Sequence, residues 1–466
     1  MSRIAVVGLG KLGACMAACF AAKGWEVAGV DVSPTAVDAL NAGRAPVPEP
    51  GLQALLDAAG GRLRATHDHA AAVADADLTF VVVPTPSLAD GRFSLEYVRP
   101  AVAAVGAALR GRRAPHVVVV TSTVLPGSME FGVQPVLEEA AGRRVGDGLG
   151  LVYNPEFIAL GTVVRDFLAP DVVLIGESDA DAGARVAAVY ERVCENRPGI
   201  ARMGFASAEL AKIALNAFVT TKISFTNMLV ELCEALPGAD VDAVCGALGH
   251  DARIGGRALR GGLGYGGPCF PRDSVALAAL ARALGHPAPI AEAADRVNDR
   301  VVPRVVARVR EHLPPGGRTA VLGLAYKAGT PIVERAHGLA IARELAQAGG
   351  DVVVWDALAN GAARAVLGAR VAWADTAAAA LDGADVAVLA ALDPALAASV
   401  GAALAPRTRP LALVDCWRLL AGAALPPAVR RVAVGVGEAT PARRARLRAL
   451  WAETNESAER PAPGEP

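Results

Sequence analysis

The sequence predicts an α/β protein in which two doubly wound parallel-sheet domains flank an all-helical segment. Short runs of valine, isoleucine and leucine alternate with helical stretches in both halves of the chain. Unbroken apolar runs are typical of strands buried on both faces, and the alternation indicates βαβ units. Strand signals are absent between about residues 206 and 291, where helices are expected, the first of them long. A Pro-Pro-Gly-Gly loop at 314–317 then precedes the second alternating region.

The expected elements follow the chain in order. Strands of the first sheet are expected at 3–7, 26–30, 79–83, 116–121 and 151–154, with helices that include 11–23, 33–42 and 95–110. The middle segment is expected to form helices at 207–236 and 274–284. Strands of the second sheet are expected at 319–322, 351–355, 385–389 and 411–415. Residues 453–466 are polar and proline-rich, which predicts a disordered tail.

The composition limits the classes of function. The 466 residues are 53% hydrophobic and 20% charged with a net charge of -1, which is typical of a soluble globular protein without the basic excess of a nucleic-acid binder. An uninterrupted apolar run long enough for a membrane span is not found, so no membrane contact is expected. The seven cysteines are scattered without a C-x-x-C spacing. A disulfide framework or a structural metal site is therefore not expected, and a reducing, cytoplasmic compartment fits best.

A glycine motif follows the first expected strand. In Gly8-Leu9-Gly10-Lys11-Leu12-Gly13, the first glycine permits a tight turn, the second lets a pyrophosphate approach the backbone, and the third allows close helix–strand packing. Asp31 ends the next strand and can accept hydrogen bonds from a ribose diol, while repelling a 2′-phosphate. The strand, helix and acid are all in place, so the motif predicts an NAD site rather than a merely structural turn.

Two further segments lie where ligands bind in a doubly wound sheet. Pro84, Thr85 and Pro86 follow one expected strand, and Ser122-Thr123 follows the next, so both segments lie at the carboxyl edge. Rigid loops without ligand contact explain these segments equally well, and both interpretations stay open.

A long helix carries a candidate pair of donors. Lys212 and Asn216 are four residues apart and share one helix face beside apolar neighbours, so the two side chains can present hydrogen-bond donors to a developing oxyanion. Taken alone, the pair fits a surface lysine and a solvated asparagine better, because such polar pairs are common on helices.

The segment around Cys269 contains the most chemistry. Five glycines occupy 261–267, and Cys269 follows at the end of this loop, one helical turn before Asp273. A loop of this kind can approach a ligand closely, and a thiol near a carboxylate and cations suits covalent catalysis on a carbonyl. The alternative is a buried structural cysteine, but a packed core has little use for so many glycines.

With these motifs in order, the chain resembles the UDP-glucose dehydrogenase and GDP-mannose dehydrogenase family from about residue 3 to about residue 420. The Cys-Phe-Pro-Arg-Asp block after the glycine loop is the most diagnostic part. Several segments carry the resemblance: 8–13, 49–52, 83–86, 122–124, 154–157, 212–216, 222–225, 253–255, 264–273 and 323–327.

The resemblance implies an NAD-dependent, four-electron oxidation of a nucleotide sugar, with UDP-glucose to UDP-glucuronate as the first candidate. It implies six catalytic residues: Cys269 as the nucleophile, Lys212 and Asn216 for the oxyanion, Asp273 for the water, and Thr123 and Glu156 for proton transfer. The implied cofactor-binding residues are Gly8, Gly10, Leu12, Gly13, Asp31, Pro84, Thr85 and Thr123. The implied substrate-binding residues are Glu156, Phe157, Lys212, Asn216, Arg253, Tyr265, Gly266 and Lys327. The resemblance implies no metal.

The resemblance also implies a domain plan. Residues 1–203 are expected to form an NAD-binding Rossmann domain, and residues 204–300 a central helical dimerisation domain with the cysteine loop. Residues 301–452 are expected to form a Rossmann-like domain that binds the nucleotide sugar. A homodimer through the central domain follows from this plan.

Three departures from the family pattern affect substrate choice. After 154–157 the family commonly continues Leu-Arg-Glu, whereas Ile158-Ala159-Leu160 stands here. After Lys327 the family commonly has Asp-Asp and then Arg-Glu-Ser, whereas 331–332 is Pro-Ile and 334–336 is Glu-Arg-Ala. Arg272 replaces the usual lysine. GDP-mannose and a UDP-N-acetylhexosamine therefore remain alternative substrates.

Two other classes of function remain as alternatives. A two-electron hydroxyacid dehydrogenase would have a similar layout, but it leaves Cys269 without a task and predicts one NADH per substrate. A non-catalytic nucleotide-sugar binder predicts binding without turnover. The presence of Lys212, Asn216, Cys269 and Asp273 together favours the four-electron enzyme.

Overall fold

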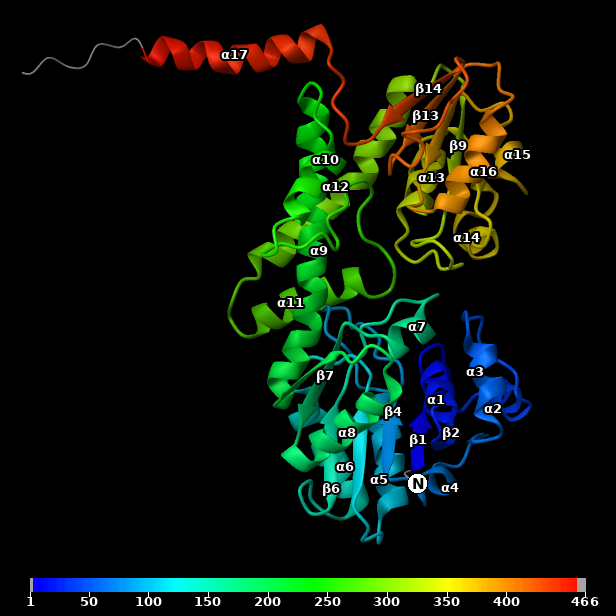
Figure 1. The fold of residues 1–466 in the computed structure, drawn as a ribbon, viewed down its shortest axis with the longest axis vertical. Helices are drawn as coiled ribbons and strands as arrows, with labels where there is room; N and C mark the ends of the chain where they lie inside the picture. Colours follow the sequence, from blue (N-terminus) through cyan, green and yellow to red (C-terminus); the bar gives the residue numbers. More distant parts are fainter. Residues whose placement is uncertain (1–2, 459–466) are drawn as a thin grey trace, which may run out of the picture. The chain divides into compact units, whose positions relative to one another are not determined.

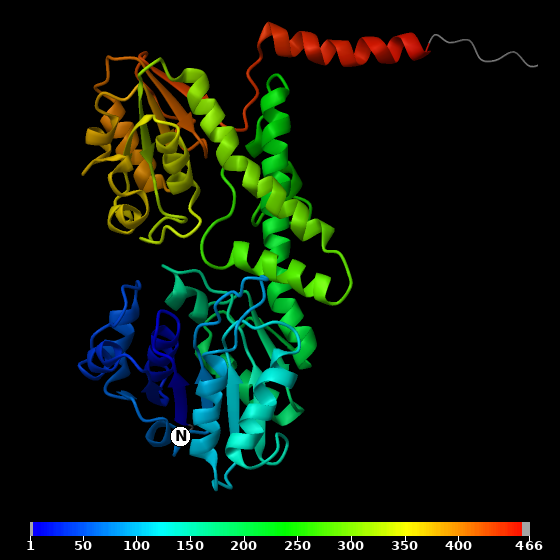
Figure 2. The same cartoon turned by 180° about the vertical axis from the view of Figure 1, so that it is seen from behind.

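The computed structural model describes residues 3–458, and its order of helices and strands confirms the predicted α/β class (Figure 1). The chain divides into two compact units. The first unit consists of the chain up to Leu215 together with Val275–Pro287, and the second of Asn216–Ser274 and the chain from Ala288 onward. Figure 2 shows the same elements from behind.

The first unit is built on an eight-stranded sheet with the order β3-β2-β1-β4-β5-β6-β7-β8. The strands are parallel except that β7 pairs antiparallel with β6, so β7 and β8 run against the other six. The strands are β1 (Arg3–Val7), β2 (Glu26–Val30), β3 (Leu63–Thr66), β4 (Leu78–Val81), β5 (His116–Val120), β6 (Leu149–Tyr153), β7 (Val172–Glu177) and β8 (Gly199–Met203).

Helices cover both faces of this sheet. They are α1 (Gly13–Ala22), α2 (Pro34–Asn41), α3 (Leu52–Ala59), α4 (His69–Val73), α5 (Val98–Leu109), α6 (Gln134–Ala141), α7 (Val163–Leu168) and α8 (Ala180–Val193), with a π-helix η1 (Ser128–Val133). Helix α1 is apolar on all sides and almost completely buried, as expected for a helix inside the core. Its Phe20 packs edge-on against Trp25 and Phe167 and tilted against Phe80.

A long helix, α9 (Phe205–Ala235), confirms the prediction of a long first helix in the middle segment. It is followed by α10 (Val241–Gly249), α11 (Phe270–Ala283) and α12 (Pro289–His312). Within the described residues α9 is the one helix with the length and hydropathy of a membrane span. Its polar residues Glu209, Lys212 and Asn216 are buried by protein, however, which is the pattern of a core helix.

The second unit contains a six-stranded parallel sheet with the order β11-β10-β9-β12-β13-β14. Its strands are β9 (Arg318–Leu322), β10 (Asp351–Trp355), β11 (Ala372–Trp373), β12 (Val386–Leu389), β13 (Leu411–Asp415) and β14 (Val429–Ala433). The helices that follow these strands are α13 (His337–Gln347), α14 (Asn360–Leu367), α15 (Ala377–Leu381) and α16 (Pro394–Leu404), with a short 3-10 helix η2 (Gly368–Arg370).

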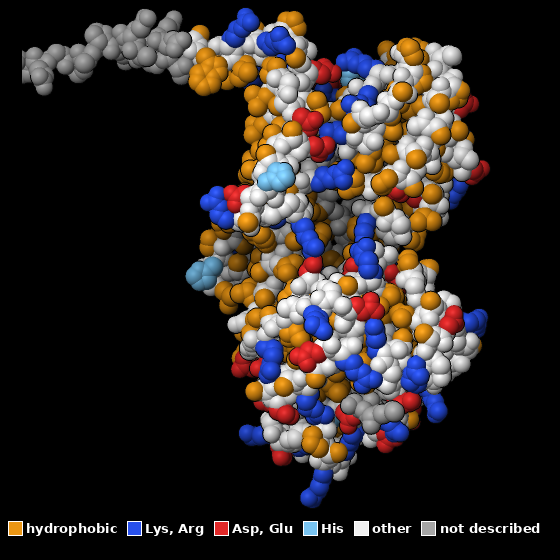
Figure 3. Space-filling view, in the orientation of Figure 1, with side chains coloured by type: hydrophobic (Ala, Val, Ile, Leu, Met, Phe, Trp, Pro, Cys, Tyr) orange, Lys and Arg blue, Asp and Glu red, His pale blue; other side chains and the backbone are white. Residues whose placement is uncertain are grey.

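The chain continues into α17 (Pro441–Ala458), which corrects one expectation. Residues 453–458 were expected to be disordered but form the last turns of α17, whose earlier residues are rich in alanine, arginine and leucine and favour helix. Residues 459–466 of the expected tail lie outside the described residues. On the face in Figure 3, basic and acidic side chains are interspersed, as the small net charge implies.

Candidate active site

The glycine turn after β1 has the geometry of a dinucleotide site. Gly8 has φ +95°, and a Cβ on it would lie 2.2 Å from the carbonyl oxygen of Val82. A Cβ on Gly13 would lie 1.8 Å from the carbonyl oxygen of Gly8, so α1 packs against the turn at a distance that only glycine allows. Gly10 faces open space, because a Cβ on it would meet no atom of another segment within 4 Å. The residues therefore leave room for a pyrophosphate at the start of α1.

The acid after β2 is fixed to this turn. The Leu9 amide donates to Asp31 Oδ2 at 2.5 Å, and the Ser33 amide donates to Asp31 Oδ1 at 2.8 Å. The carboxylate is therefore oriented beside the glycine turn, where a ribose diol fits. Leu12 is partly buried and packs against the core of the first unit, so its side chain supports the turn.

The two loops at the carboxyl edge of the sheet are joined. The Thr85 hydroxyl donates to the carbonyl oxygen of Thr123 at 2.8 Å. The Ser122 hydroxyl donates to the carbonyl oxygen of Val83 at 2.6 Å and accepts from its amide at 3.0 Å. Pro84, between these contacts in the sequence, is exposed, whereas Thr85 is buried. The two segments therefore lie together at the carboxyl edge of the sheet, as the sequence predicted. Whether they bind a ligand or only form rigid loops was left open by the sequence.

Lys212 is held against the loop that follows β6. Its side chain is 5% exposed, its Nζ donates to the carbonyl oxygen of Glu156 at 2.6 Å, and it lies 4.3 Å from the centroid of the Phe157 ring. The interpretation of Lys212 as a surface lysine is therefore wrong. Backbone and ring contacts fix the position of this cation.

Glu156 has the electrostatics of a proton-transfer group. The Tyr190 hydroxyl forms hydrogen bonds with the Glu156 carboxylate and, at 2.6 Å, with Asn154 Oδ1. Burial raises the pKa of Glu156 to about 7, while the Tyr190 hydrogen bond and the Lys212 cation oppose this shift. A carboxyl group that titrates near neutrality can both donate and accept a proton at the pH of the cell.

In the second unit, Asn216 and Asp273 form a buried pair. Asn216 Nδ2 donates to Asp273 Oδ2 at 2.6 Å, and Arg272 Nε donates to Asp273 Oδ1 at 3.2 Å. Asn216 and Asp273 are 6% and 1% exposed. The solvated-asparagine interpretation is therefore wrong for Asn216, because its amide is fixed by a carboxylate.

Cys269 lies directly before the first turn of α11. Its carbonyl oxygen accepts from the Asp273 amide at 2.9 Å, and the residue is exposed, in contrast to the buried cysteine of the alternative interpretation. A thiolate at a helix N-terminus is stabilised by the helix dipole and by free backbone N–H groups, which is a common arrangement for a reactive cysteine. The position suits a nucleophile.

The glycines before Cys269 mainly allow close packing within the second unit. A Cβ on Gly264 would lie 1.8 Å from Asn298 Oδ1, and one on Gly266 would lie 2.4 Å from the Arg335 carbonyl oxygen. Gly267 has φ +80° and lies under the Tyr326 ring. The loop was expected to wrap around a ligand, which stays a prediction; the structure shows that these glycines are also needed because neighbouring segments come so near.

Tyr265, an expected substrate contact, is 4% exposed. Its hydroxyl bonds to the Asp295 carboxylate, and its amide donates to Asn298 Oδ1 at 2.9 Å. Burial, reinforced by Asp295, raises the pKa of Tyr265 above its usual range. These contacts place its polar atoms in a network with α12.

The remaining expected contacts lie on two loops of the second unit. The Arg253 guanidinium, on an 88% exposed side chain, pairs with Asp251 at 2.6 Å. Lys327 follows β9 and is partly buried. The segment that departs from the family pattern supports the cysteine loop, because the Gly267 amide donates to the Glu334 carbonyl oxygen at 3.0 Å. In the first unit, the departure Leu160 packs against the apolar core.

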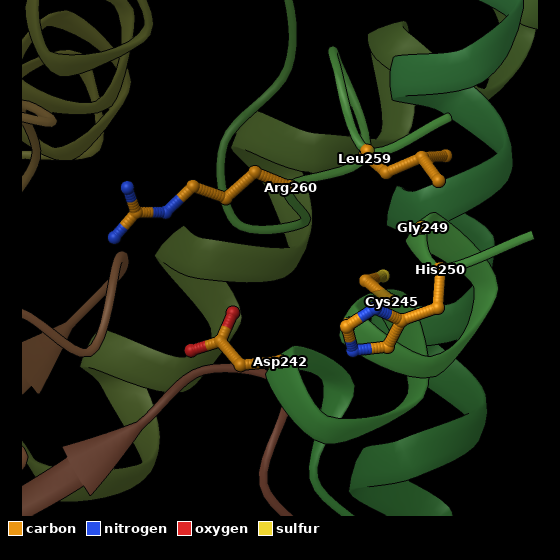
Figure 4. Close-up of a pocket in the computed structure, with 8 residues that line it drawn as sticks. Asp242, Cys245, Gly249, His250, Leu259 and Arg260 are labelled. Carbon is orange, nitrogen blue, oxygen red and sulfur yellow. The ribbon is translucent and has the colours of Figure 1, made fainter. Parts of the chain in front are cut away.

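A cavity of about 470 Å³ in the second unit lies beside α10. Figure 4 shows its lining, in which Asp242, His250 and Arg260 supply the polar groups. Asp242 is also bound by the buried Arg418 through two hydrogen bonds of 2.7 and 2.8 Å. The lining of this cavity contains none of the residues expected to act on the substrate.

Two residues of the first unit were not expected from the sequence. Tyr190 on α8 holds Glu156, and Glu209 on α9 holds the backbone after Thr123. A signal for Glu209 exists, because an acid three residues before Lys212 shares its helix face. No sequence pattern near Tyr190 predicts a role for it, because its contact with Glu156 forms only when α8 packs in the folded chain.

Models of one family match most of the chain. Residues 2–194 match the NAD binding domain of the UDP-glucose/GDP-mannose dehydrogenase family, residues 206–300 its central domain, and residues 320–422 its UDP binding domain. The glycine turn and Asp31 lie within the first match, so the observed geometry and the cofactor, NAD, agree.

Individual relatives agree with the family match. The UDP-glucose 6-dehydrogenase AglM of Haloferax volcanii is 40% identical over 83% of this chain and 90% of the relative. The GDP-mannose 6-dehydrogenase of Pseudomonas putida is 37% identical over 72% of this chain and 78% of the relative. The solved UDP-glucose dehydrogenase of Pyrobaculum islandicum is 35% identical with a TM-score of 0.82, covering 94% of this chain and 97% of that one. The chain therefore belongs to the UDP-glucose/GDP-mannose dehydrogenase family.

Proposed function

We propose that this chain is an NAD-dependent nucleotide-sugar 6-dehydrogenase that oxidises the C6 alcohol of a hexose to a carboxylate. The observation that carries the proposal is the exposed thiol of Cys269 at the start of α11, one turn before the Asn216–Asp273 pair. Family membership supports the class of reaction. A thiol is needed because the half-oxidised sugar is an aldehyde, which otherwise has to be hydrated before its second oxidation.

The chemistry balances over two oxidations. Bound NAD supplies the hydride acceptor for the alcohol and again for the covalent adduct. Between the two oxidations, the Cys269 sulfur adds to the aldehyde carbon and gives a thiohemiacetal, which becomes a thioester when oxidised. Water then cleaves the thioester, releasing the carboxylate and regenerating the thiol. Each alcohol consumes two NAD and one water, and yields two NADH and three protons.

The side chains have separate tasks in this proposal. Lys212 and Asn216, one turn apart on α9, donate hydrogen bonds to the oxygen that gains negative charge. Asp273 orients the hydrolytic water. Glu156 and Thr123 remove the proton of the alcohol. The raised pKa of Glu156, about 7, suits this transfer because the carboxyl group can accept and release a proton near neutral pH. NAD is held by Gly8, Gly10, Leu12, Gly13, Asp31, Pro84, Thr85 and Thr123, and the nucleotide sugar by Glu156, Phe157, Lys212, Asn216, Arg253, Tyr265, Gly266 and Lys327.

UDP-glucose is the first candidate substrate. Two of the relatives act, by name, on UDP-glucose and on GDP-mannose, and the third family match is a UDP binding domain. The segment 331–336 departs from the family pattern beside the cysteine loop, which keeps GDP-mannose as the second candidate. A UDP-N-acetylhexosamine is third.

The proposed assembly is a homodimer through α9. Three phenylalanine and leucine side chains spaced by seven residues, Phe218, Phe225 and Leu232, are 66%, 47% and 51% exposed on this helix. An apolar stripe at this spacing is typical of a helix that packs on a second helix, and a copy of the same chain fits a self-complementary stripe. Phe225→Glu is expected to give monomers in sedimentation analysis, and an unchanged dimer would reject this interface.

The domain plan and compartment remain proposals as well. We assign NAD binding to residues 1–203, dimerisation and the cysteine loop to 204–300, and nucleotide-sugar binding to 301–452. In the described part of the chain all seven cysteines are thiols rather than disulfides, which suits a reducing cytoplasm.

The decisive experiment counts NADH per sugar consumed, with NAD and a panel of UDP-glucose, GDP-mannose and UDP-N-acetylhexosamines. Two NADH per sugar are expected, whereas one would indicate a hydroxyacid-type dehydrogenase and none a binding protein. Cys269→Ser is expected to lose the four-electron turnover and to leave at most slow aldehyde formation. Cys194→Ser is the matched control, because Cys194 is partly buried in the first unit and has no assigned task. Full turnover by Cys269→Ser would remove Cys269 as the nucleophile.

A further inference from the structure

Glu209 is a fully buried carboxylate one turn before Lys212 on α9. The Gly127 amide donates to its Oε2 at 2.8 Å, and the Met129 amide donates to its Oε1 at 2.8 Å. Gly127 has φ +90° and precedes η1, whose first amides have no partner within a helix. Both carboxylate oxygens therefore bind the start of η1 from a different helix.

The loop that connects β5 to η1, residues 121–127, contains Thr123. Its beginning is fixed to the neighbouring strand by Ser122 and Thr85. In its middle, Leu125 packs in a buried cluster with Ile213 of α9. Its end is fixed by Glu209. Helix α9 therefore holds this loop through one apolar and one charged contact, on turns that flank Lys212.

A carboxylate is a costly way to fill this position. Burial raises the pKa of Glu209 to about 7, although the amides of Met129 and Gly127 oppose the shift. Filling the space alone would need only an apolar side chain, without the desolvation of a charge. Two backbone N–H groups would then be buried without acceptors, at a cost of about 1–3 kcal/mol each. The carboxylate is explained by the need to fix the loop.

We propose that Glu209 is a positioning residue, which fixes the Thr123 loop to the turn of α9 that carries Lys212. Glu209 and Lys212 are three residues apart and share a helix face, so a shift of the loop changes the separation of Thr123 from the lysine cation. This inference rests on the proposed function, in which Thr123 and Lys212 act on the same alcohol. In this role Glu209 acts through the loop, because both of its carboxylate oxygens accept from backbone amides.

Glu209→Gln tests the proposal, because the amide keeps the size but turns an N–H group toward a backbone N–H. The expected result is a fall in kcat of about 10–100-fold, since a misplacement of about 1 Å costs this much. The KM values for NAD and for the best nucleotide sugar of the panel are expected to stay within about threefold. Glu209→Asp keeps the charge and is expected to recover part of kcat. Rates are expressed per folded site, counted by NADH titration.

The control is Asp415→Asn, which alters a matched carboxylate in the second unit. Asp415 is 0% exposed and accepts from the amides of Leu419 and Leu420 at 3.1 and 2.9 Å. The melting temperature is expected to fall to a similar extent in both variants, but kcat only in Glu209→Gln. In a protein that already carries Thr123→Val, adding Glu209→Gln is expected to lower kcat by less than threefold, because the two changes then affect one interaction.

Two results overturn the proposal. One is an unchanged kcat per folded site in both Glu209→Gln and Glu209→Asp. The other is a fall in kcat from Glu209→Gln that is as large in the Thr123→Val background as in the unaltered protein. If Glu209→Gln fails to fold, Glu209→Asp is measured alone, with the same two criteria. Failure of the proposed function is distinguishable, because the unaltered protein would then oxidise no nucleotide sugar or release one NADH per sugar.

Discussion

The turns after β1 and β9, the first strands of the two sheets in chain order, are built alike. Gly8 and Gly323 both have φ +95°. A Cβ on Gly13 would lie 1.8 Å from the Gly8 carbonyl oxygen, and one on Gly338 would lie 2.0 Å from the Gly323 carbonyl oxygen. In both sheets a helix starts so close to the first strand that its early turn tolerates only glycine.

The acids that follow the second strands also correspond. Asp31 after β2 accepts from the amide of Leu9, and Asp356 after β10 accepts from the amide of Leu324. The distribution of the other hydrogen bonds differs. Asp356 also binds the amides of Ala325, Leu358 and Ala359, so its two oxygens serve four backbone groups.

The two units differ in what lies between strand and helix. In the first, α1 begins at Gly13, directly after the turn, and Gly10 leaves open space for a phosphate. In the second, residues 323–336 separate β9 from α13; this segment carries Lys327 and packs against the cysteine loop. In the proposed function the same turn architecture therefore has two tasks. The short connection after β1 leaves space for a phosphate, and the longer one after β9 supports the loop that carries Cys269.

The largest expected effect comes from filling the third glycine of each turn. Gly13→Ala and Gly338→Ala each place a methyl group on a backbone oxygen, which is expected to destabilise the affected unit by about 3 kcal/mol or more. Only Gly13→Ala is expected to abolish NADH binding. Calorimetry and NADH fluorescence titration measure the two effects. NADH binding that survives Gly13→Ala but not Gly338→Ala would reverse the assignment of tasks.

The next effect comes from the two acids. Asp356→Asn is expected to cost about 1–3 kcal/mol of stability, because four mostly part-buried amides lose a charged acceptor, while the KM for NAD stays unchanged. Asp31→Asn is expected to raise the KM for NAD about tenfold and to relax the discrimination against NADP, because the repulsion of a 2′-phosphate is removed. Steady-state kinetics with both cofactors distinguishes the two acids, and equal effects on KM would contradict their different tasks.

The smallest effect is a pH dependence from buried histidines, because burial lowers the pKa to about 4 both for His116 in the first unit and for His337 in the second. The buried His116 ring donates from Nδ1 to the Ala76 carbonyl and accepts from the Thr79 hydroxyl at Nε2, and burial lowers its pKa to about 4. Because the folded state binds this proton more weakly than the unfolded state, stability is retained above pH 6.5 and is lost as the pH falls toward 4. At pH 5 the loss is expected to be about 1–2 kcal/mol.

Urea unfolding at pH 5 and pH 8 measures this loss, and His116→Gln is expected to reduce the difference between the two values. Glu156 acts in the opposite direction, because its raised pKa of about 7 makes the folded state take up a proton as the pH falls. An acid loss that is unchanged in His116→Gln would show that other groups cause it.

Local patterns explain what the sequence could predict. Gly8, Gly13 and Asp31 lie within one βαβ unit, so strand, turn, helix and acid can be read from adjacent residues. The joining of Thr85 to Thr123 followed from the rule that ligand-binding loops meet at the carboxyl edge of a parallel sheet. Cys269 was expected because its neighbours in sequence are the residues that set its position.

The sequence analysis missed contacts between residues far apart in the chain and several strands of the two sheets. The hydrogen bonds that Glu209 accepts from Gly127 and Met129, and the one between Tyr190 and Glu156, join residues far apart in sequence. The position of Glu209 before Lys212 marks the residue as a candidate, but no local pattern predicts these partners. Strands β8 and β14 went unrecognised because they contain arginines and partly or fully exposed residues instead of an apolar run. Strand β7 was also not expected, although it is a buried apolar run. The close packing around the glycine loop depends on segments about 30 to 150 residues later, so it could not be read from the glycine content of the loop alone.

Among the seven cysteines, all within the described residues, Cys269 is exposed and the other six are buried or partly buried. Burial raises the pKa of Cys15 to about 12 and that of Cys194 to about 11, so these thiols stay protonated and inert at neutral pH. A mild alkylating reagent should therefore label one sulfur per chain. A fluorophore or mass label attached to Cys269 can therefore report the fraction of protein with a reactive Cys269 thiol in any preparation.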